Sequence, residues 1–320
     1  MSYPPFKVSV LTVTYNHERY IEQAVRSALA QETDFAVEIV VADDCSTDGT
    51  REILRRLDLE FPGRLRLLLR DRNLGATANF ADALATCTGE YLALLEGDDY
   101  WTDTSKLARQ VNFLDQHPEY EGTAHVVRQL SATTDYGLFP HHSPDVVTFQ
   151  DLLVNNRFAT CSVLYRRRWS VLPGWHRKCT MGDWPLHILH ASRGPFRVFP
   201  EVMGVYRIHE QGMWATAKVT WQLRQTVAMY QQLAGAYPEY ARAIAGCKLR
   251  HQYVLLYELA KSREWSGVRE WIRAIATDVS RSRRADVLHF LAMSCRIIPE
   301  VVYRAVSPLW TPAPSQIQKA

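Results

Sequence analysis

Short apolar segments alternate with amphipathic segments along the first hundred residues of the chain. Residues 8–13 are β-branched and apolar and are followed by polar positions, which predicts a buried strand. The apolar positions of residues 20–29 then recur at the spacing of one helix face. The same pattern predicts further strands at 37–42, 65–69 and 91–95 and further helices at 48–59 and 78–87. Strands and helices joined by short links are typical of right-handed crossovers and a parallel sheet.

The pattern is less regular after residue 120. Apolar runs predict strands at 122–130, 162–165, 197–199 and 202–206 and a helix at 184–191. From about residue 219 the pattern becomes helical throughout, in three or four amphipathic segments. We therefore expect an α/β domain over residues 1–214, with a Rossmann-like, mostly parallel sheet flanked by helices. An all-helical C-terminal region is expected over residues 215–320.

Composition narrows the class of protein. Hydrophobic residues make up 47% of the chain and charged residues 22%, which is ordinary for a soluble globular protein. The sequence contains no run of eighteen apolar residues and no secretory signal pattern in residues 1–7, so we expect neither a transmembrane helix nor export. The six cysteines are scattered without a Cys-x-x-Cys pair, which favours thiols in a reducing compartment and a cytoplasmic protein.

Charge is unevenly distributed. The net charge is +3, but residues 215–320 carry 15 Lys/Arg and 7 Asp/Glu, so the rest of the chain is net acidic. The amphipathic pattern over 281–304, with arginines beside an apolar face, would suit peripheral contact with the inner face of a membrane. A solvated helical face and packing on the rest of the chain or a second subunit are the alternatives. Nucleic-acid binding is disfavoured because aromatic and basic residues are not interleaved.

Three carboxylates occupy four positions directly after the strand predicted at 91–95. They are Glu96, Asp98 and Asp99. Carboxylates packed this closely repel one another unless a cation lies among them. Mg²⁺ or Mn²⁺ suits such a site because it takes few protein oxygens and completes its shell with phosphate. A polar turn that caps a helix after Trp101 is the other interpretation, but the carboxyl end of a parallel strand favours a ligand site.

A second acidic pair, Asp43 and Asp44, also follows a predicted strand. A carboxylate at this place could accept the imide or ribose protons of a nucleotide. Ser46 or Asp48 is expected to be only the cap of the next helix.

Four segments in this order and spacing resemble a known family. They are Thr14-Tyr15-Asn16, residues 40–50, Arg72-Asn73-Leu74-Gly75 with Asn79, and Glu96-Gly97-Asp98-Asp99. The chain resembles the family 2 glycosyltransferases, which have the GT-A fold and use nucleotide diphosphate sugars. The resemblance covers about residues 6–214. It implies a nucleotide-binding half over about 1–120 and an acceptor half over about 121–214.

The resemblance implies a role for each matching residue of the donor site. Thr14 and Tyr15 would line the base pocket, with the Tyr15 ring stacked on the base. Asp43 or Asp44 would hydrogen-bond the base, and Arg72 would help to close the pocket. The other donor-site residues in the matching motifs are Asn16, Asn73, Gly75, Asn79, Glu96 and Gly97.

Glu96-Gly97-Asp98 occupies the position of the family's Asp-x-Asp motif. The first acid of that motif usually meets the ribose and the last binds the metal, which implies Asp98 as a metal ligand with Asp99 second. Glu96 departs from the usual Asp. Its longer side chain could still reach a ribose hydroxyl, but the choice of donor is left open.

Two later segments also match the family. Met181-Gly182-Asp183-Trp184 resembles its acid-containing motif, and Asp183 would be the base that an inverting transfer needs; an N-cap is its alternative role. Tyr206-Arg207-Ile208-His209 resembles a segment that closes over the pyrophosphate. Arg207 would offset the charge of the leaving group, and His209 would bind the metal or a phosphate, with a purely structural histidine as the alternative.

The sequence thus predicts an inverting, Mn²⁺- or Mg²⁺-dependent glycosyltransferase. The resemblance implies a bacterial surface polysaccharide or lipid-linked oligosaccharide as the acceptor. The same fold acting on a protein side chain or small metabolite, and an inactive scaffold, are the alternatives. The absence of Gly-x-Gly-x-x-Gly after Val13 argues against a dinucleotide oxidoreductase. The sugar, base, linkage and oligomeric state, for which a dimer is one option, are left open.

Overall fold

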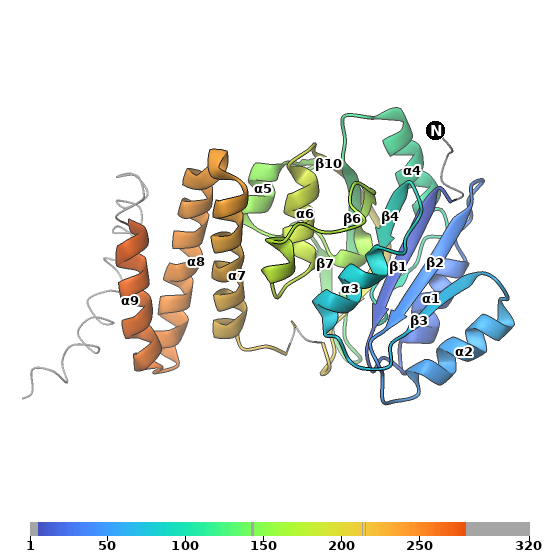
Figure 1. Ribbon diagram of the computed structural model, residues 1–320, viewed down its shortest axis with the longest axis horizontal. Coiled ribbons are helices and arrows are strands. Elements are labelled where there is room, and N and C mark those ends of the chain that lie inside the picture. Colours follow the sequence, from blue (N-terminus) through green and yellow to red (C-terminus); the bar gives the residue numbers. More distant parts are fainter. Residues whose placement is uncertain (1–5, 142–143, 213, 215, 280–320) are drawn as a thin grey trace, which may run out of the picture. The chain divides into compact units, whose positions relative to one another are not determined.

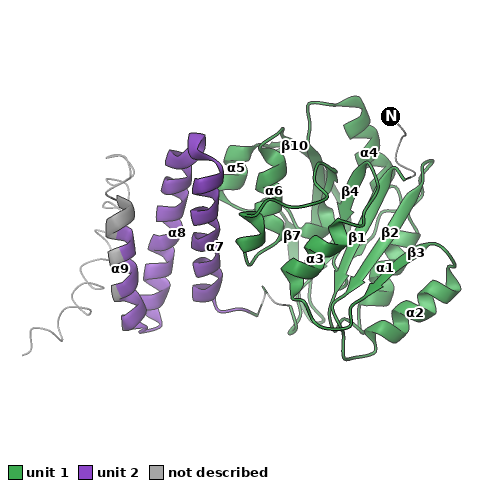
Figure 2. Cartoon of the chain, in the orientation of Figure 1, with its two compact units in different colours: residues 1–216 green, residues 217–320 purple. Residues whose placement is uncertain are grey.

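The structure, a computed structural model, describes residues 6–141, 144–212, 214 and 216–279 (Figure 1). The chain forms two compact units, residues 1–216 and 217–320 (Figure 2). The first is an α/β unit, and the second consists of helices as far as it is described. The predicted α/β class with a helical C-terminal part is therefore confirmed.

One ten-stranded sheet forms the centre of the first unit, in the order β3-β2-β1-β4-β9-β6-β10-β5, with β7 beside β6 and β8 beside β10. The strands are β1 (Val8–Thr14), β2 (Val37–Asp43), β3 (Leu65–Leu69), β4 (Tyr91–Leu94), β5 (Tyr100–Trp101), β6 (Gly122–Leu130), β7 (Asp135–Phe139), β8 (Val146–Val147), β9 (Leu164–Arg166) and β10 (Phe196–Arg207). Strands β1 to β4 run parallel, as do β6 and β10. The sheet is nevertheless mixed rather than mostly parallel, because β9 enters between β4 and β6 in the opposite direction.

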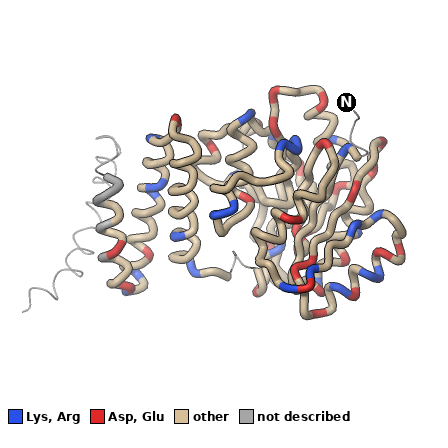
Figure 3. Tube along the Cα trace, viewed as in Figure 1, with Lys and Arg blue, Asp and Glu red and all other residues tan. Residues whose placement is uncertain are grey.

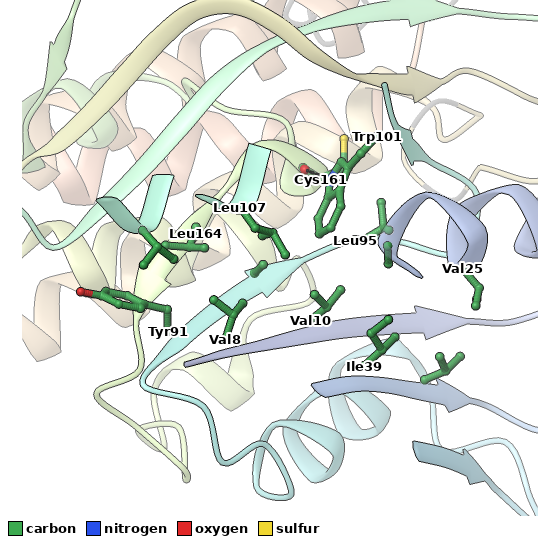
Figure 4. Close-up of a cluster of buried hydrophobic side chains, with 14 of the residues drawn as sticks. Val8, Val10, Val25, Ile39, Tyr91, Leu95, Trp101, Leu107, Cys161 and Leu164 are labelled. Carbon is green, nitrogen blue, oxygen red and sulfur yellow. Dashed lines mark hydrogen bonds between the residues drawn. The ribbon is translucent and has the colours of Figure 1, made fainter. Parts of the chain in front are cut away.

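Helices cover the sheet of the first unit. They are α1 (Ile21–Leu29), α2 (Thr50–Glu60), α3 (Ala76–Leu84), α4 (Lys106–Gln116), α5 (Phe149–Val154) and α6 (Asp183–Ala191), with 3-10 turns η1 (Thr160–Ser162) and η2 (His176–Lys178). Val8 and Val10 of β1 belong to a buried cluster with Val25 of α1 and Leu107 of α4 (Figure 4). Ser9 and Leu11, on the other face of β1, are also buried. Burial on both faces explains why apolar and polar positions do not simply alternate along this strand.

The second half of this unit differs from the predicted elements. The strands predicted at 197–199 and 202–206 form the single strand β10, whose register with β6 shifts on either side of Val202. Pro200 lies inside the irregular stretch and has no N–H for the ladder, which accounts for the apparent gap in the pattern. Helix α5 has no counterpart in the predicted elements, and α4 corresponds only to the helix after Trp101 in the alternative interpretation of the acidic turn.

The second unit contains α7 (Val219–Ala236), α8 (Ala241–Lys261) and α9 (Trp265–Val279), with a 3-10 turn at Pro238–Tyr240. Leu255 and Leu259 of α8 pack in one apolar cluster with Val268 and Ile275 of α9. Within the described ranges, no helix has the length and apolar character needed to cross a membrane. The amphipathic helix predicted over 281–304 lies outside the described residues.

Candidate active site

The carboxyl ends of β1, β2 and β4 bring three of the predicted motifs together. Thr14 at the end of β1 is in register with Asp43 at the end of β2. The backbone N–H of Gly97, just after β4, donates to the carbonyl of Val13 at 3.0 Å. Figure 3 shows acidic and basic positions side by side at this edge, and Asp43 forms an ion pair there with Arg51. Ligands of parallel sheets bind at such an edge.

Asp98 lies between two histidines. Its Oδ2 is 2.9 Å from Nε2 of His209, which follows β10, and 3.8 Å from Nε2 of His17, which follows β1. The ligand atoms of the three side chains lie within 4.8 Å of one another. Two imidazole nitrogens and one carboxylate oxygen at this spacing fit a divalent metal ion. Asp98 and His209 belong to the predicted ligand set, whereas His17 does not, although it directly follows the motif at residues 14–16.

Asp99, the second acid predicted to bind the metal, lies outside this group. Its side chain is buried, and its Oδ1 accepts the backbone N–H of Arg207 at 2.8 Å. The Arg207 guanidinium donates to the carbonyl of Asp98 and to Gln23 Oε1 and lies over the ring of Tyr100. Arg207 and Asp99 therefore fasten the end of β10 to the turn after β4, and the guanidinium is occupied by protein partners.

The clustered acids differ in their pKa values. Burial, together with the charges of Asp99 and Asp98, raises the pKa of Glu96 well above its usual range. Burial and the charge of Asp98 do the same to the pKa of Asp99. Burial acts on Asp98 in the same direction, but its hydrogen bond with His209 and the proximity of His17 outweigh it and lower the Asp98 pKa. Asp98 is thus the acid of this turn that ionises most readily, as a metal ligand must.

Gly97 allows the acidic turn to approach β1. A Cβ atom at this position would lie 2.6 Å from Oγ1 of Thr14 and 3.0 Å from Nδ1 of His17. Any side chain would therefore displace one of these two residues. The acidic turn does not cap the next helix, since α4 begins only at Lys106 and has Ser105 as its N-cap residue.

Tyr15 and Asp43 present free groups where the base is expected. The Tyr15 side chain is exposed. One oxygen of Asp43, Oδ1, accepts from the Arg51 guanidinium and from the backbone N–H of Ser46. Asp43 Oδ2 and the hydroxyl of Thr14 are buried and have no hydrogen-bond partner among the described residues. Because a buried polar atom without a partner costs free energy, both atoms suit hydrogen bonds to a ligand.

Asp44 shapes a loop rather than facing the base. Its two oxygens accept the backbone N–H groups of Leu74 at 2.7 Å and Gly75 at 2.9 Å. Asn73 Oδ1 also accepts the N–H of Gly75, whose φ of 84° favours glycine. Arg72, at the start of the loop, is exposed. Of the two acids predicted to meet the base, only Asp43 keeps an oxygen available.

Asn16 and Asn79 are also held by protein partners. Asn16 has a φ of 56° and accepts the backbone N–H of Thr47 at 2.8 Å, which ties the end of β1 to the loop after β2. Asn79 is buried, donates to the carbonyl of Ala42 at 3.0 Å and accepts from Arg70 at 3.0 Å. Both asparagines therefore support the walls of the site.

Asp183 begins α6, and the N-cap position belongs to Gly182. Asp183 Oδ2 accepts from Asn156 Nδ2 at 3.2 Å and from Thr160 Oγ1 at 3.4 Å. Its charge adds to burial and to the other two acids in raising the pKa of Glu96. The predicted base thus lies within electrostatic reach of the acidic turn.

Comparison with known proteins extends these findings. The model of glycosyl transferase family 2 matches residues 9–169. An uncharacterized protein of Mycobacterium tuberculosis is 41% identical over 214 residues, 66% of this chain and 61% of that protein. The chain thus spans about three fifths of that relative's length. TuaG of Bacillus subtilis, named as a teichuronic acid biosynthesis glycosyltransferase, is 29% identical over 222 residues, 67% of this chain and 85% of that protein.

Solved structures share the fold. Staphylococcus aureus TarS 1-349 in complex with UDP matches with a TM-score of 0.56 and 20% identity, covering 77% of this chain and 70% of that one. The mannosyltransferase PcManGT of Pyrobaculum calidifontis, in complex with GDP-Man and Mn²⁺, matches with a TM-score of 0.56 and 18% identity. The match covers 97% of this chain and 88% of that one. At these identities the likeness speaks for the GT-A fold alone. Because the family model covers half of the chain and the motifs within it meet at one edge of the sheet, the chain belongs to glycosyl transferase family 2.

Proposed function

We propose that this protein is an inverting glycosyltransferase that uses a divalent metal ion to move a sugar from a nucleotide diphosphate to a hydroxyl acceptor. One observation carries the proposal. Asp98 meets His209 at the same sheet edge where Asp43 and Thr14 keep buried, unpartnered oxygens. A metal ligand pair thus lies beside groups that suit a base and a ribose. We assign the chemistry to residues 1–214.

The donor would occupy the ends of β1 and β2. Tyr15 would stack on the base, and Asp43 Oδ2 would accept a proton from it, with Arg72 closing the pocket from its loop. Glu96 would meet the ribose, whose hydroxyl groups can donate hydrogen bonds to its carboxylate. TarS with UDP and PcManGT with GDP-Man support a nucleotide-sugar donor but differ in base, so the base is left open.

Asp98 and His209 would hold Mn²⁺ or Mg²⁺ against the diphosphate. The ion, when bound, neutralises the phosphate oxygens and stabilises the charge that grows on the leaving group. Arg207 and Asp99 position the ligands by fixing the end of β10 on the acidic turn. The Mn²⁺ of PcManGT supports this part of the proposal.

Asp183 would act as the base. The acceptor oxygen attacks the anomeric carbon from the face opposite the diphosphate, the bond to the phosphate oxygen breaks, and the acceptor proton passes to Asp183. Asn156 and Thr160 both donate to Oδ2 of Asp183, which leaves Oδ1 for that proton. The carboxylate is thereby held in one orientation.

The acceptor is proposed to be a bacterial surface polysaccharide or a lipid-linked oligosaccharide. The similarity to TuaG supports this class. Contact of the basic region 215–320 with the inner face of the membrane would bring the enzyme to such an acceptor. A protein side chain or a small metabolite is the alternative acceptor.

Calorimetry of nucleotide binding tests the proposal. UDP, GDP, dTDP and CDP are titrated into the full chain with and without Mn²⁺, and the titrations are repeated with Asp98→Asn. Asp82→Asn is the control, because Asp82 is exposed and forms an ion pair with Arg70. We expect Mn²⁺-dependent binding of one nucleotide, lost in Asp98→Asn and kept in the control. An absence of nucleotide binding under all conditions would contradict the transferase function and favour an inactive scaffold.

A further inference from the structure

His17 is held rigidly beside Asp98. Its backbone N–H donates to Oγ1 of Thr50 at 2.9 Å, and its carbonyl accepts the N–H groups of Tyr20 and Ile21, each at 2.9 Å. These bonds fix the backbone on both sides of the residue. The local fold of the turn between β1 and α1 therefore places His17 beside Asp98.

The ring of His17 also faces the ring of His209. Their centroids are 6.0 Å apart and the planes are nearly perpendicular, while Nε2 of each ring points at the same oxygen of Asp98. Ligands bound about 2.1 Å from one ion lie about 3 Å apart when they are adjacent. The observed separations from Asp98 Oδ2, 2.9 and 3.8 Å, need only small side-chain rotations to reach that geometry.

Two neighbours of this group agree with a role for His17 as a ligand. Gly97 leaves the room that the imidazole occupies, since a Cβ at this position would come within 3.0 Å of the ring. Asp99 does not belong to the group of ligand atoms that lie within 4.8 Å of one another, and its Oδ1 accepts the backbone N–H of Arg207.

We propose that His17 is the third protein ligand of the metal ion, in place of Asp99, and that this ligand set selects a transition metal over Mg²⁺. The inference rests on the proposed metal-dependent function and specifies its ion. Mg²⁺ prefers oxygen ligands, whereas imidazole nitrogen favours Mn²⁺, Co²⁺ and Zn²⁺ in increasing order of affinity. Three protein ligands leave the remaining coordination positions for the donor diphosphate and water.

The test measures binding of Mn²⁺ alone to the full chain, by the paramagnetic resonance signal of the free ion. His17→Gln is compared with Asp99→Asn and with His117→Gln, an exposed histidine at the end of α4. We expect His17→Gln to weaken Mn²⁺ binding by at least about tenfold, and the other two variants to bind as the unaltered chain does. Co²⁺ and Zn²⁺ should displace Mn²⁺ readily, and a large excess of Mg²⁺ should not.

Proton NMR of the Co²⁺-bound chain gives a second measurement that needs no variant, because each coordinated imidazole contributes its own strongly shifted, exchangeable N–H signal. A spectrum with fewer than two imidazoles would overturn the proposal. So would a folded His17→Gln variant that binds Mn²⁺ as tightly as the unaltered chain, or displacement of Mn²⁺ by an equal concentration of Mg²⁺. The calorimetric test of nucleotide binding is separate, so loss of the His17 assignment would leave the transferase function standing.

Discussion

His209 Nε2 lies 2.9 Å from Asp98 Oδ2, although 111 positions separate these residues in the chain. The pairing of β10 with β5 creates this contact, since β5 begins at Tyr100, two residues after Asp98, and β10 ends at Arg207, two residues before His209. The register of two strands from opposite halves of the α/β unit thus brings the two proposed metal ligands together. Changes that alter the acidic turn should therefore affect folding and metal binding together.

Gly97→Ala should test this coupling. The added Cβ would overlap Thr14 and press on His17, so we expect a loss of about 1–3 kcal/mol in the free energy of unfolding and weaker Mn²⁺ binding. Urea unfolding and metal titration provide the measurements. Gly174→Ala is the matched control, because nothing lies within 4 Å of its Cβ, and it should change stability by less than about 0.5 kcal/mol. Equal stability of the two variants would contradict the packing argument.

Asp44→Asn should loosen the loop that carries Arg72. The amide keeps one acceptor but turns a donor toward a backbone N–H, so we expect about 1–3 kcal/mol of destabilisation. Hydrogen exchange at the amides of Leu74 and Gly75, which the carboxylate now protects, should become faster. Asp82→Asn removes only an exposed ion pair and should leave both amides unchanged. If exchange at these two amides is the same in Asp44→Asn, Asp44 does not hold the loop.

The parallel half of the sheet could be predicted because its signal is local. β3 has the bounds that the apolar pattern predicts, Leu65–Leu69, and β1, β2 and β4 each differ from their predicted bounds by one residue. Each strand there is a short apolar run closed by polar residues, and each motif follows such a run. The positions of Asp43, Asp98 and Asp183 relative to their elements follow from the same signal.

The remaining features depend on contacts between distant segments. Strand β5 has two residues and leaves no periodic pattern, so neither the pairing that carries His209 to Asp98 nor the approach of His17 could be predicted. Lys106 of α4 looks like a surface residue in the sequence but is fully buried. Its Nζ lies 4.0 Å from the centre of the Trp101 ring and donates to Gln110 at 2.8 Å. Only the folded structure supplies these compensating partners.

Acid should destabilise the protein through its buried histidines. Burial, with the nearby charge of Lys106, lowers the pKa of His125 from 6.5 to about 3, and burial lowers the pKa values of His176 and His187 to about 4. Below pH 6.5 the unfolded chain takes up protons that the folded chain does not. Each histidine should therefore remove up to about 1.4 kcal/mol of stability per pH unit as the pH falls from 6.5 toward the pKa of that histidine in the folded protein.

His125→Gln isolates one of these contributions. Glutamine cannot take up a proton, so unfolding of the variant should bind about one proton fewer. The slope of the free energy of unfolding against pH should therefore decrease by about 1.4 kcal/mol per pH unit between pH 6 and 4.5. Urea unfolding across this range measures it. His117→Gln, which removes a histidine whose side chain is 42% exposed, is measured beside it as the control. A slope in His125→Gln equal to that of the unaltered chain would show that His125 is protonated in the folded state.

Asp183→Asn should separate chemistry from donor binding. Removing a general base costs about 10²–10⁴-fold in rate, while the donor contacts proposed at Tyr15 and Asp43 are untouched. Because water can replace the acceptor hydroxyl, slow hydrolysis of the donor sugar, followed by release of the nucleotide diphosphate, measures the rate. Calorimetry should give the same nucleotide affinity for the variant. A variant that hydrolyses the donor at the original rate would remove Asp183 from the mechanism.

Thr160 refines this prediction, because its hydroxyl donates to Oδ2 of Asp183 and also lowers the pKa of Glu96. Thr160→Val keeps the shape of the side chain but removes its hydrogen-bond donor, so Asn156 alone would orient the carboxylate of Asp183. We expect a smaller loss of rate than in Asp183→Asn, and recovery in Thr160→Ser, which restores the hydroxyl. In the double variant Thr160→Val/Asp183→Asn, the loss of hydrolysis rate should equal that in Asp183→Asn alone, because Thr160 acts through Asp183. Additive losses would instead mean that Thr160 acts on the donor side through Glu96.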